Sequence, residues 1–454
     1  MLTRHSSFCK SRSFILVCCL LLIIGIIAYL YFADTTNPEI LEKEQIEENL
    51  KTYAGQDLNY TYVSSYIKRY GIGNIQSSKI NTVEKLLEVD FYKELPAEYE
   101  TARIVCELYL EYFYDTVDKN DQEAVTDAIL ACLVASTGDR YAYYRTAEEY
   151  EAYMSSIQGQ DSFVGIGILV NSQTREIIMV YKDSGAEAAG IRRHDIIHSV
   201  EGITFEDTSS DELINMLRGD EGTTVNITVK RGDELIDLTV MRKTFTEQTV
   251  YREIDEDNVG YIYVTQFLAT TVDDFKEAVD YCVENNAEAI VIDVRSNPGG
   301  LVNSAVSMVD YLVPDAEGRR ILYYTQGKNK YEYYTTDNHS VDLPIAILCN
   351  GGTASSAEIF TSAMRDFSDM GLVNAVIVGD TTYGKGIVQR SYPIIDGSAV
   401  TFTIGFFYTP NEVNFHGEGI EPDFKVEETT GEDAPFEKAK DELLKLVNST
   451  DGAE

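Results

Sequence analysis

The spacing of apolar residues changes twice along the chain. Between Val83 and Met154, apolar residues recur three and four positions apart, which predicts helices; they include Leu86, Leu87, Ala102, Val105, Leu108, Tyr109, Tyr112 and Phe113. Between Phe163 and Arg242 the segments are shorter and alternate with a period of two, which is typical of strands. From Val259 onwards, strand-like and helix-like segments alternate. The pattern therefore predicts a helical domain, a β-domain and an α/β layer.

The α/β layer is expected to contain a parallel sheet. Its predicted strands are Tyr261–Val264, Ala289–Val294, Pro344–Cys349 and Ala375–Gly379, and its predicted helices are Val272–Glu284, Leu301–Leu312 and Ile359–Phe367. Strand, helix and strand in succession favour right-handed crossovers between parallel strands. Glycine-containing turns follow two of the strands, and ligands in such sheets bind beyond the carboxyl ends of the strands. We therefore expect the site at this edge.

The N-terminus carries a candidate membrane anchor. Phe14 to Phe32 is an uncharged apolar run of 19 residues, preceded by Arg4, Lys10 and Arg12. This length spans a bilayer, and positive charge before the span predicts that the rest of the chain lies outside the cytoplasm. A cleaved signal peptide is the alternative, but the run is longer than its apolar region, and no small-x-small cleavage site follows closely.

Composition excludes several classes of function. The 454 residues are 44% hydrophobic, enough for two or three domains, and carry a formal charge of −38, which disfavours nucleic acid as a partner. Cys106, Cys132, Cys282 and Cys349 lie in apolar patterns without disulfide or zinc spacing, so we expect inert thiols. The five histidines form no metal-ligand motif, so neither a metal nor any other cofactor is predicted.

The β-domain has a recognisable glycine signature. Its predicted strands are Ile166–Val170, Ile177–Tyr181, Ile196–Val200 and Val225–Val229, with one helix at Asp211–Arg218. The signature consists of Gly165-Ile166-Gly167, then Gly185 to Gly190, Asp195-Ile196-Ile197 and the turn Glu201-Gly202. In this order, it resembles a PDZ domain.

The PDZ resemblance implies a peptide-binding function. Such domains add a peptide C-terminus as a strand, and loop N–H groups receive its carboxylate. The corresponding residues are Phe163, Val164, Gly165, Ile166 and Gly167. Arg218, at the end of the predicted helix, is a candidate for relaying occupancy to a catalytic site, with ordinary surface hydrogen bonding as its alternative.

Three stretches of the α/β layer carry candidate chemistry. Asn350 to Glu358 joins a predicted strand to a predicted helix, as either a nucleophile elbow or a Ser/Thr-rich helix cap. A serine needs a base, and because histidine is scarce, the base would be a lysine made neutral by burial. Lys385 lies between two glycines, with Asp380 the nearest carboxylate in sequence, but on these local grounds alone a solvated turn lysine is favoured. The third stretch is Asn297-Pro298-Gly299-Gly300.

Taken in order after a PDZ-like segment, these stretches resemble the carboxyl-terminal processing proteases, serine peptidases of family S41. The resemblance covers about Val83 to Val426 and includes Tyr408-Thr409-Pro410 and Gly419-Ile420-Glu421-Pro422-Asp423. It implies a nucleophile and a general base, Ser355 and Lys385, with Gln389 orienting the lysine. It also implies an oxyanion hole, made by the N–H of Ser356 and that of Gly299 or Gly300.

The sequence departs from the family pattern in two ways. The 30-residue interval from Ser355 to Lys385 is longer than usual, which predicts extra residues around 367–372. Ser356-Ala357 also stands where the family more often has Ala-Ser, so that a second hydroxyl adjoins the nucleophile.

The predicted fold class is an α+β multidomain protein: a helical N-terminal domain, a PDZ-like β-domain and an α/β core of crotonase/ClpP-like type, behind one N-terminal transmembrane helix. The expected divisions are a cytoplasmic basic segment (1–13), the anchor (14–32), a stalk or disordered linker (33–82), the helical domain (83–160), the PDZ-like domain (161–245), the core (246–430) and an acidic C-terminal helix or tail (431–454).

The resemblance implies a membrane-anchored serine endopeptidase that cleaves proteins near their C-termini. Expected partners are proteins or peptides with exposed apolar C-termini, the membrane, and a homo-oligomer or activator protein. The expected location is the outer face of a bacterial cytoplasmic membrane. A latent or inactive membrane-anchored PDZ adaptor is the alternative function. The predicted core also resembles the crotonase fold of acyl-CoA enzymes, but fold alone assigns no chemistry. The anchor and the PDZ segment disfavour an acyl-CoA enzyme, which is expected to be soluble and cytosolic.

Overall fold

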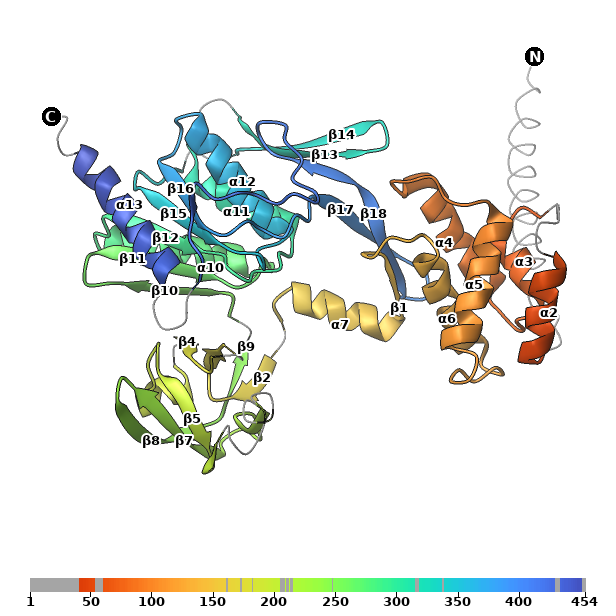
Figure 1. Ribbon diagram of the computed structural model, residues 1–454, viewed down its shortest axis with the longest axis horizontal. Coiled ribbons are helices and arrows are strands. Elements are labelled where there is room, and N and C mark those ends of the chain that lie inside the picture. The colour runs from red at the N-terminus through yellow and green to blue at the C-terminus, as the bar shows by residue number, and fades with distance from the viewer. Residues whose placement is uncertain are drawn as a thin grey trace, which may run out of the picture. The chain divides into compact units, whose positions relative to one another are not determined.

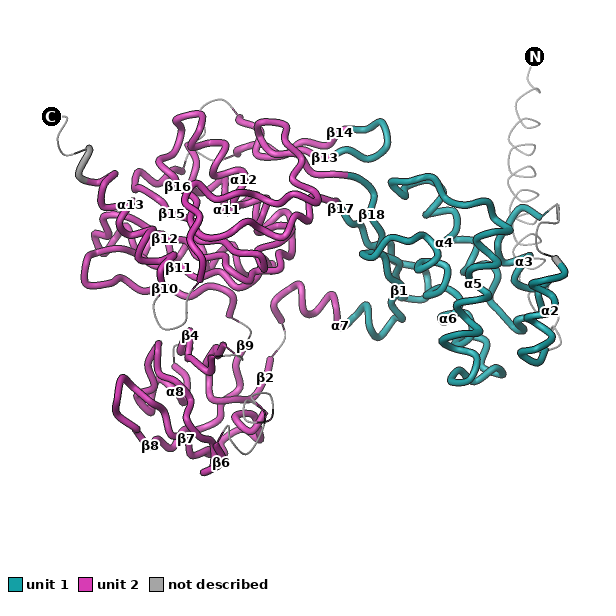
Figure 2. The backbone as a smooth tube through the Cα atoms, in the orientation of Figure 1, with its two compact units in different colours: residues 1–151, 325–329, 388–405 teal, residues 152–324, 330–387, 406–454 magenta. Residues whose placement is uncertain are grey.

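The computed structural model describes residues 41–53, 60–160, 162–171, 174–181, 183–204, 209, 212, 215–246, 248–314, 318–336, 339–428 and 433–450. The chain forms two compact units (Figure 2). The first contains residues 1–151, 325–329 and 388–405, and the second contains residues 152–324, 330–387 and 406–454. The predicted anchor at 14–32 lies outside the described residues. Within those residues, no helix combines the length and apolar content needed to cross a membrane.

The first unit is built mainly from helices. These are α2 (Lys43–Tyr53), α3 (Val63–Tyr70), α4 (Ser77–Asp90), α5 (Glu98–Tyr112) and α6 (Gln122–Ala135). Ile46 and Ile67 are fully buried, and Tyr66 is nearly so. The expectation of a stalk or linker over 33–82 is therefore wrong for residues 43–53 and 63–82, which belong to the packed helical domain. The apolar face of α3 repeats at helical spacing but is only eight residues long, too short for the pattern to stand out.

A strand follows the helices of this unit. β1 (Tyr143–Arg145) pairs antiparallel with β18 (Ala399–Tyr408), so that Tyr143 lies opposite Thr401. Helix α7 (Ala147–Ile157) follows β1. The strands β1, β18, β13 (Arg320–Gln326) and β14 (Asn329–Tyr334) form one sheet in that order, and β17 (Ile387–Pro393) pairs with β18. The hydrophobic pattern of the sequence did not predict these five strands.

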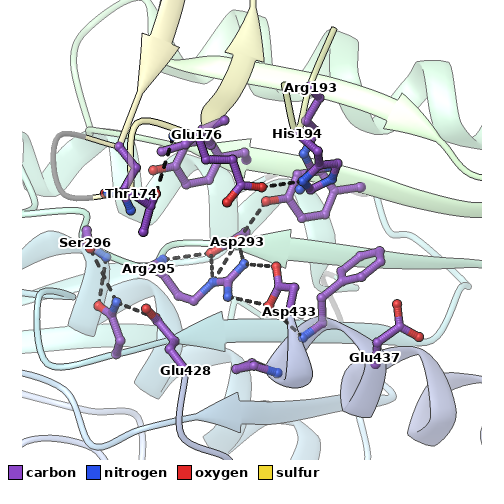
Figure 3. Close-up of a pocket in the computed structure, with 17 residues that line it drawn as sticks. Thr174, Glu176, Arg193, His194, Asp293, Arg295, Ser296, Glu428, Asp433 and Glu437 are labelled. Carbon is purple, nitrogen blue, oxygen red and sulfur yellow. Dashed lines mark hydrogen bonds and ion pairs between the residues drawn. The ribbon is translucent and has the colours of Figure 1, made fainter. Parts of the chain in front are cut away.

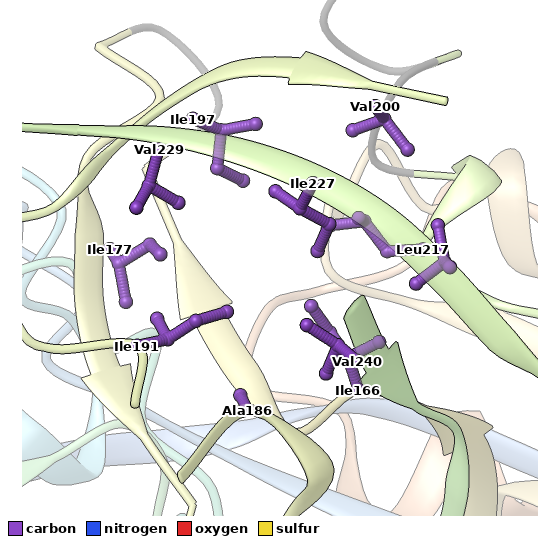
Figure 4. Close-up of a cluster of buried hydrophobic side chains, with 11 residues drawn as sticks. Ile166, Ile177, Ala186, Ile191, Ile197, Val200, Leu217, Ile227, Val229 and Val240 are labelled. Carbon is purple, nitrogen blue, oxygen red and sulfur yellow. The ribbon is translucent and has the colours of Figure 1, made fainter. Parts of the chain in front are cut away.

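The PDZ-like domain occupies part of the second unit. Its strands are β2 (Ser162–Gly165), β3 (Ile168–Val170), β4 (Ile177–Val180), β5 (Ile196–Val200), β6 (Ile203–Thr204), β7 (Thr224–Arg231), β8 (Glu234–Met241) and β9 (Lys243–Thr246), with the short helix α8 (Gly185–Ala189). Alternate residues of these strands meet in one apolar core, which includes Ile177, Ile197 and Ile227 (Figure 4). The predicted helix at 211–218 lies partly outside the described residues.

The remainder of the second unit is the α/β core (Figure 1). Its six-stranded sheet has the order β10 (Val250–Ile254), β11 (Val259–Val264), β12 (Ala289–Asp293), β15 (Ile345–Cys349), β16 (Ala375–Gly379) and β19 (Phe424–Lys425). Neighbouring strands from β11 to β19 are parallel, as predicted, whereas β10 pairs antiparallel with β11. β12 and β15 are buried along their whole lengths, which explains their continuous apolar runs.

Helices pack on this sheet. They are α10 (Thr271–Glu284), α11 (Val302–Leu312), α12 (Ser356–Asp369) and α13 (Ala434–Thr450). Ala439 and Leu443 of α13 pack among sheet residues such as Val291 and Leu348, so the C-terminal helix belongs to the core. Phe360 of α12 packs edge-to-face on Phe275 of α10. The strands β12 and β15, whose carboxyl ends lead into the candidate site, are thus part of a well-packed core.

Candidate active site

A sharp turn joins β15 to α12. The Asn350 N–H donates to Thr353 Oγ1 at 3.0 Å, and Thr353 Oγ1 donates to the Val294 carbonyl at 2.8 Å, which fastens the turn to the end of β12. Ser355, just before α12, has φ +55° and ψ −117°. A serine rarely adopts this conformation, and such strain persists only where the surroundings impose it. The turn therefore has the strained geometry of a nucleophile elbow.

The two adjacent serines differ in their surroundings. Ser356 is fully buried, and its hydroxyl donates to the Gly300 carbonyl at 2.9 Å. Ser355 is only half-buried. The hydroxyl of Ser356 is therefore engaged in holding the neighbouring turn, which leaves Ser355 as the better candidate nucleophile.

The Asn297–Gly300 turn lies directly against the elbow. Asn297 is fully buried; its side chain donates to the Val264 carbonyl at 2.8 Å and accepts the Gly299 N–H at 2.9 Å. Gly299 has φ +101°, and a Cβ at this position would lie 2.8 Å from Ser355 Cβ and 2.9 Å from the Ser356 nitrogen. Only glycine fits this approach without displacing the elbow.

Glu358, on the first turn of α12, connects the elbow to the lysine loop. It is fully buried, and its two oxygens accept four hydrogen bonds. The Ser355 N–H and the Lys385 N–H donate to Oε2 at 2.8 and 2.7 Å, while Thr382 Oγ1 and the Gly384 N–H each donate to Oε1 at 2.6 Å. Because one oxygen accepts from both, the backbone nitrogens of Ser355 and Lys385 are close neighbours. Glu358 was not predicted as a site residue, although Ser-x-x-Glu before a helix is a capping-box signal.

The loop carrying Lys385 also packs against a second segment. The Gly417 N–H donates to the Gly384 carbonyl at 2.9 Å, and a Cβ on Gly386 would lie 2.8 Å from the His416 nitrogen. Lys385 itself is half-buried. The loop is thus held on one side by Glu358 and on the other by residues 415–419.

Gln389 lies on β17, in the first unit. Its side-chain amide donates to the Tyr141 carbonyl at 2.6 Å. Its assignment as the group that orients Lys385 stays a prediction.

The predicted peptide-binding segment of the PDZ-like domain runs from β2 into β3. Phe163 is 36% exposed and packs against the rings of Tyr181 and Phe245, whereas Ile166 is buried and its carbonyl accepts the Ala186 N–H at 2.9 Å. Gly167 has φ +81°. Val164 is half-buried, and Gly165 lies opposite Lys243.

Arg218 is exposed. Just before it in sequence, the Met216 and Leu217 carbonyls accept hydrogen bonds from the Arg242 guanidinium, at 2.8 and 3.2 Å. The gating role of Arg218 stays a prediction.

A polar cavity of about 590 Å³ lies where the PDZ-like domain meets the core (Figure 3). From the PDZ-like domain, its lining includes Glu176, Arg193 and His194. From the core, the lining includes Asp293, Arg295, Ser296, Asn350, Glu428 and Asp433. Ser296 and Asn350, on the loops that follow β12 and β15, line this cavity, whereas Ser355 and Lys385 do not.

The four cysteines among the described residues, Cys106, Cys132, Cys282 and Cys349, are free and buried, as expected. Burial raises the pKa of both Cys132 and Cys349 to about 12. A thiol is nucleophilic only as the thiolate, so these two groups are unsuited to catalysis at neutral pH.

Comparison with known proteins identifies two families in the chain. The family profiles "Peptidase family S41" and "PDZ domain" match residues 258–426 and 164–241. A probable CtpA-like serine protease of Staphylococcus aureus is 30% identical over 377 residues, covering 81% of this chain and 68% of the relative. The carboxy-terminal processing protease CtpA of Bacillus subtilis is 33% identical over 316 residues, covering 69% of this chain and 66% of the relative.

A similar protein of Staphylococcus epidermidis, also described as a probable CtpA-like serine protease, is 32% identical over 70% of this chain. The chain spans about 65% of its length. Among solved structures, a putative S41 protease from Bacteroides fragilis matches with a TM-score of 0.52 at 15% identity, covering 82% of this chain and 97% of that one. At this identity, the likeness concerns the fold alone. The matched profiles and relatives together show that the chain belongs to peptidase family S41, as a CtpA-like member with a PDZ domain.

Proposed function

We propose that this protein is a serine endopeptidase that uses Ser355 as nucleophile and Lys385 as general base to cleave proteins near their C-termini. The observation that carries the proposal is the carboxylate of Glu358, which binds the backbone N–H groups of both residues. It brings a strained serine and a half-buried lysine, 30 positions apart in sequence, to the same place.

The proposed reaction is acyl transfer. Neutral Lys385 takes the proton of the Ser355 hydroxyl while Ser355 Oγ forms a bond to the substrate carbonyl carbon. Lys385 then gives this proton to the leaving amine as the C–N bond breaks. Water, deprotonated by Lys385, attacks the acyl ester, and Lys385 returns this proton to Ser355 Oγ as the ester C–O bond breaks. Gln389 is proposed to orient the lysine.

The oxyanion would be held by two backbone N–H groups, each contributing about 3 kcal/mol. One is that of Ser356, at the start of α12, where the helix leaves its first amides without intrahelical partners. For the other we favour Gly300, because the Gly299 N–H already donates to the Asn297 side chain.

The PDZ-like domain is proposed to recruit the substrate. An apolar C-terminal tail would add as a strand beside Phe163–Gly167, with its carboxylate on the N–H groups of the loop. Attachment to the membrane through residues 14–32, with the catalytic part outside the cytoplasm, is also proposed. It rests on the apolar run and the preceding positive charges. A homo-oligomer or an activator protein is a further expected partner.

The test uses the full chain and the variants Ser355→Ala, Lys385→Ala and Ser356→Ala. Each is incubated with an unfolded protein that ends in an apolar tail, and the fragments are identified by mass. We expect wild type to cut near the C-terminus and Ser355→Ala and Lys385→Ala not to cut. Ser356→Ala should still cut, because it loses only the hydrogen bond to Gly300 and keeps its backbone N–H.

The alternative function is a latent or inactive PDZ adaptor. It would be favoured if the wild-type protein bound the tail but left the substrate intact. Cleavage that persists in Ser355→Ala would refute the proposed nucleophile.

A further inference from the structure

Two acidic residues that follow β19, Glu428 and Asp433, contact the loops after β15 and β12. Both lie beyond residue 426, where the match to the peptidase family profile ends. Glu428 accepts a hydrogen bond from the Asn350 side chain at 2.8 Å, and Asp433 accepts two from the Arg295 guanidinium, at 2.7 and 2.8 Å. Figure 3 shows the two carboxylates at one side of the polar cavity. We call Glu428 and Asp433 the C-terminal clamp.

Arg295 occupies a rigid position at the end of β12. Its side chain is only 14% exposed and also bonds to Asp293, with the guanidinium Nε 3.0 Å from each carboxylate oxygen. Asp293 is nearly fully buried and accepts the Tyr261 hydroxyl at 2.7 Å. A planar guanidinium held by two carboxylates has little freedom to rotate. Arg295 therefore sets where the chain leaves the strand, one residue before Ser296 and two before Asn297.

The second clamp contact, between Glu428 and Asn350, involves the loops after β12 and β15. Asn350 Oδ1 accepts the Ser296 N–H at 2.8 Å and the Gly352 N–H at 3.0 Å. The same side chain therefore joins the loop after β12 to the loop after β15. Glu428 fixes its orientation by accepting from its amide nitrogen. Ser296 has φ +57°, a conformation that requires such support.

Asp433 is itself held by the helix that it precedes. Its Oδ1 accepts the Phe436 N–H at 3.2 Å, as the cap of α13. The helix is fixed on the sheet by buried Ala439 and Leu443, and Lys440 pairs with Asp255 at 2.6 Å. The carboxylate that binds Arg295 therefore caps a helix that is itself packed on the sheet.

We infer that Asp433 and Glu428 are positioning residues, which hold the Asn297–Gly300 turn against the Ser355 elbow from outside the matched peptidase region. The inference rests on the proposed peptidase function. Asp433, through Arg295, is the stronger contact because it is a doubly hydrogen-bonded ion pair.

The test compares Asp433→Asn with Glu437→Gln in the full chain. Asparagine also caps helices well, so Asp433→Asn keeps α13 but removes the negative charge from Arg295. Glu437→Gln removes a charge from an exposed neighbour that lines the same cavity. For each variant we would measure kcat and KM on the tailed substrate, helix content, and hydrogen exchange of residues 296–300 and 350–354.

For Asp433→Asn we expect kcat to fall about tenfold at unchanged KM and unchanged helix content, because misplacing catalytic groups slows the chemical step. Exchange in both loops should accelerate, and Glu437→Gln should match wild type in every measurement. Unchanged exchange in Asp433→Asn, or an unchanged kcat in an active enzyme, would overturn the inference. If wild type proves inactive, the peptidase proposal fails by itself, and faster exchange in Asp433→Asn still establishes the clamp.

Discussion

At the scale of single residues, the geometry of the site depends on the hydrogen bonds that the Glu358 carboxylate accepts. Glu358 is buried, yet it accepts one hydroxyl and three backbone N–H groups, which compensate its charge. The side chain is therefore a rigid connection between the elbow and the lysine loop.

Replacing Glu358 by glutamine tests this connection. The amide has one acceptor oxygen, and its NH₂ group would face backbone N–H donors. We expect a loss of about 3 kcal/mol in the free energy of unfolding, since buried donors lose their partners, and a loss of kcat/KM of about a hundredfold. Urea unfolding and substrate cleavage measure these effects. Glu418→Gln, an exposed change on the neighbouring loop, should alter neither. Wild-type activity in Glu358→Gln would contradict the role given to the carboxylate.

At the scale of elements, one carboxyl group makes the stability of a helix depend on pH. Glu84 of α4 is buried, and its carboxylate accepts the Val63 N–H at 3.0 Å. Burial raises the pKa of Glu84 from 4.5 to about 7; nearby Glu88 and Glu98 add to the rise, and the Val63 N–H opposes it. The folded state thus holds this proton more tightly than the unfolded state.

The sign of the pH dependence follows directly. The favourable contribution of Glu84 is complete below about pH 4.5, falls as the pH rises, and is lost above about pH 7. Glu84→Gln does not titrate. Relative to wild type, we therefore expect it to gain about 1 to 3 kcal/mol in the free energy of unfolding between pH 4.5 and pH 8. Urea unfolding at several pH values measures this gain, with Glu48→Gln, an exposed change on α2, as control. A constant difference at all pH values would show that the pKa of Glu84 is the same in the folded and unfolded states.

At the scale of the second unit, the PDZ-like domain and the core share side-chain contacts. Tyr181 of the PDZ-like domain packs on Tyr251 of β10 at 5.4 Å, and Arg193 lies over the ring of Tyr261 at 4.3 Å while pairing with Glu253. Cation–π and aromatic contacts of this kind contribute about 1 kcal/mol each. Tyr181 also packs on Phe163, so the segment proposed to bind the peptide is connected to β10 through Tyr181.

Peptide binding can be tested without cleavage in Ser355→Ala. If the loop at Gly165–Gly167 receives a carboxylate, an apolar peptide with a free C-terminus should bind at least about tenfold more tightly than the same peptide amidated. Hydrogen bonds to a charged group of this kind contribute about 1.5 to 3 kcal/mol. Calorimetric titration of both peptides measures the ratio. Equal affinities would mean that the C-terminal carboxylate is not recognised.

Local pattern determined much of this protein. The apolar runs of β12 and β15 predicted their positions within one residue, because strands buried on both faces need continuous apolar sequence. Turn motifs around Gly299, Ser355 and Lys385 identified the candidate site and, through their order, the family. Each of these signals extends over about ten residues or fewer, because backbone conformation and the burial of neighbouring side chains leave their pattern in short stretches of sequence.

Tertiary structure alone decided the rest. Two features of the site join residues that are distant in sequence: the pairing of Arg295 with Asp433 and the four donors to Glu358. The packing of α2 and α3 into the helical domain depends on apolar patterns that are too short to stand out in the sequence. A buried carboxylate is satisfied by any suitable donor, so the sequence does not reveal which one the fold supplies. The sequence by itself therefore determined which residues could perform the chemistry, and the packed core decided how they are held.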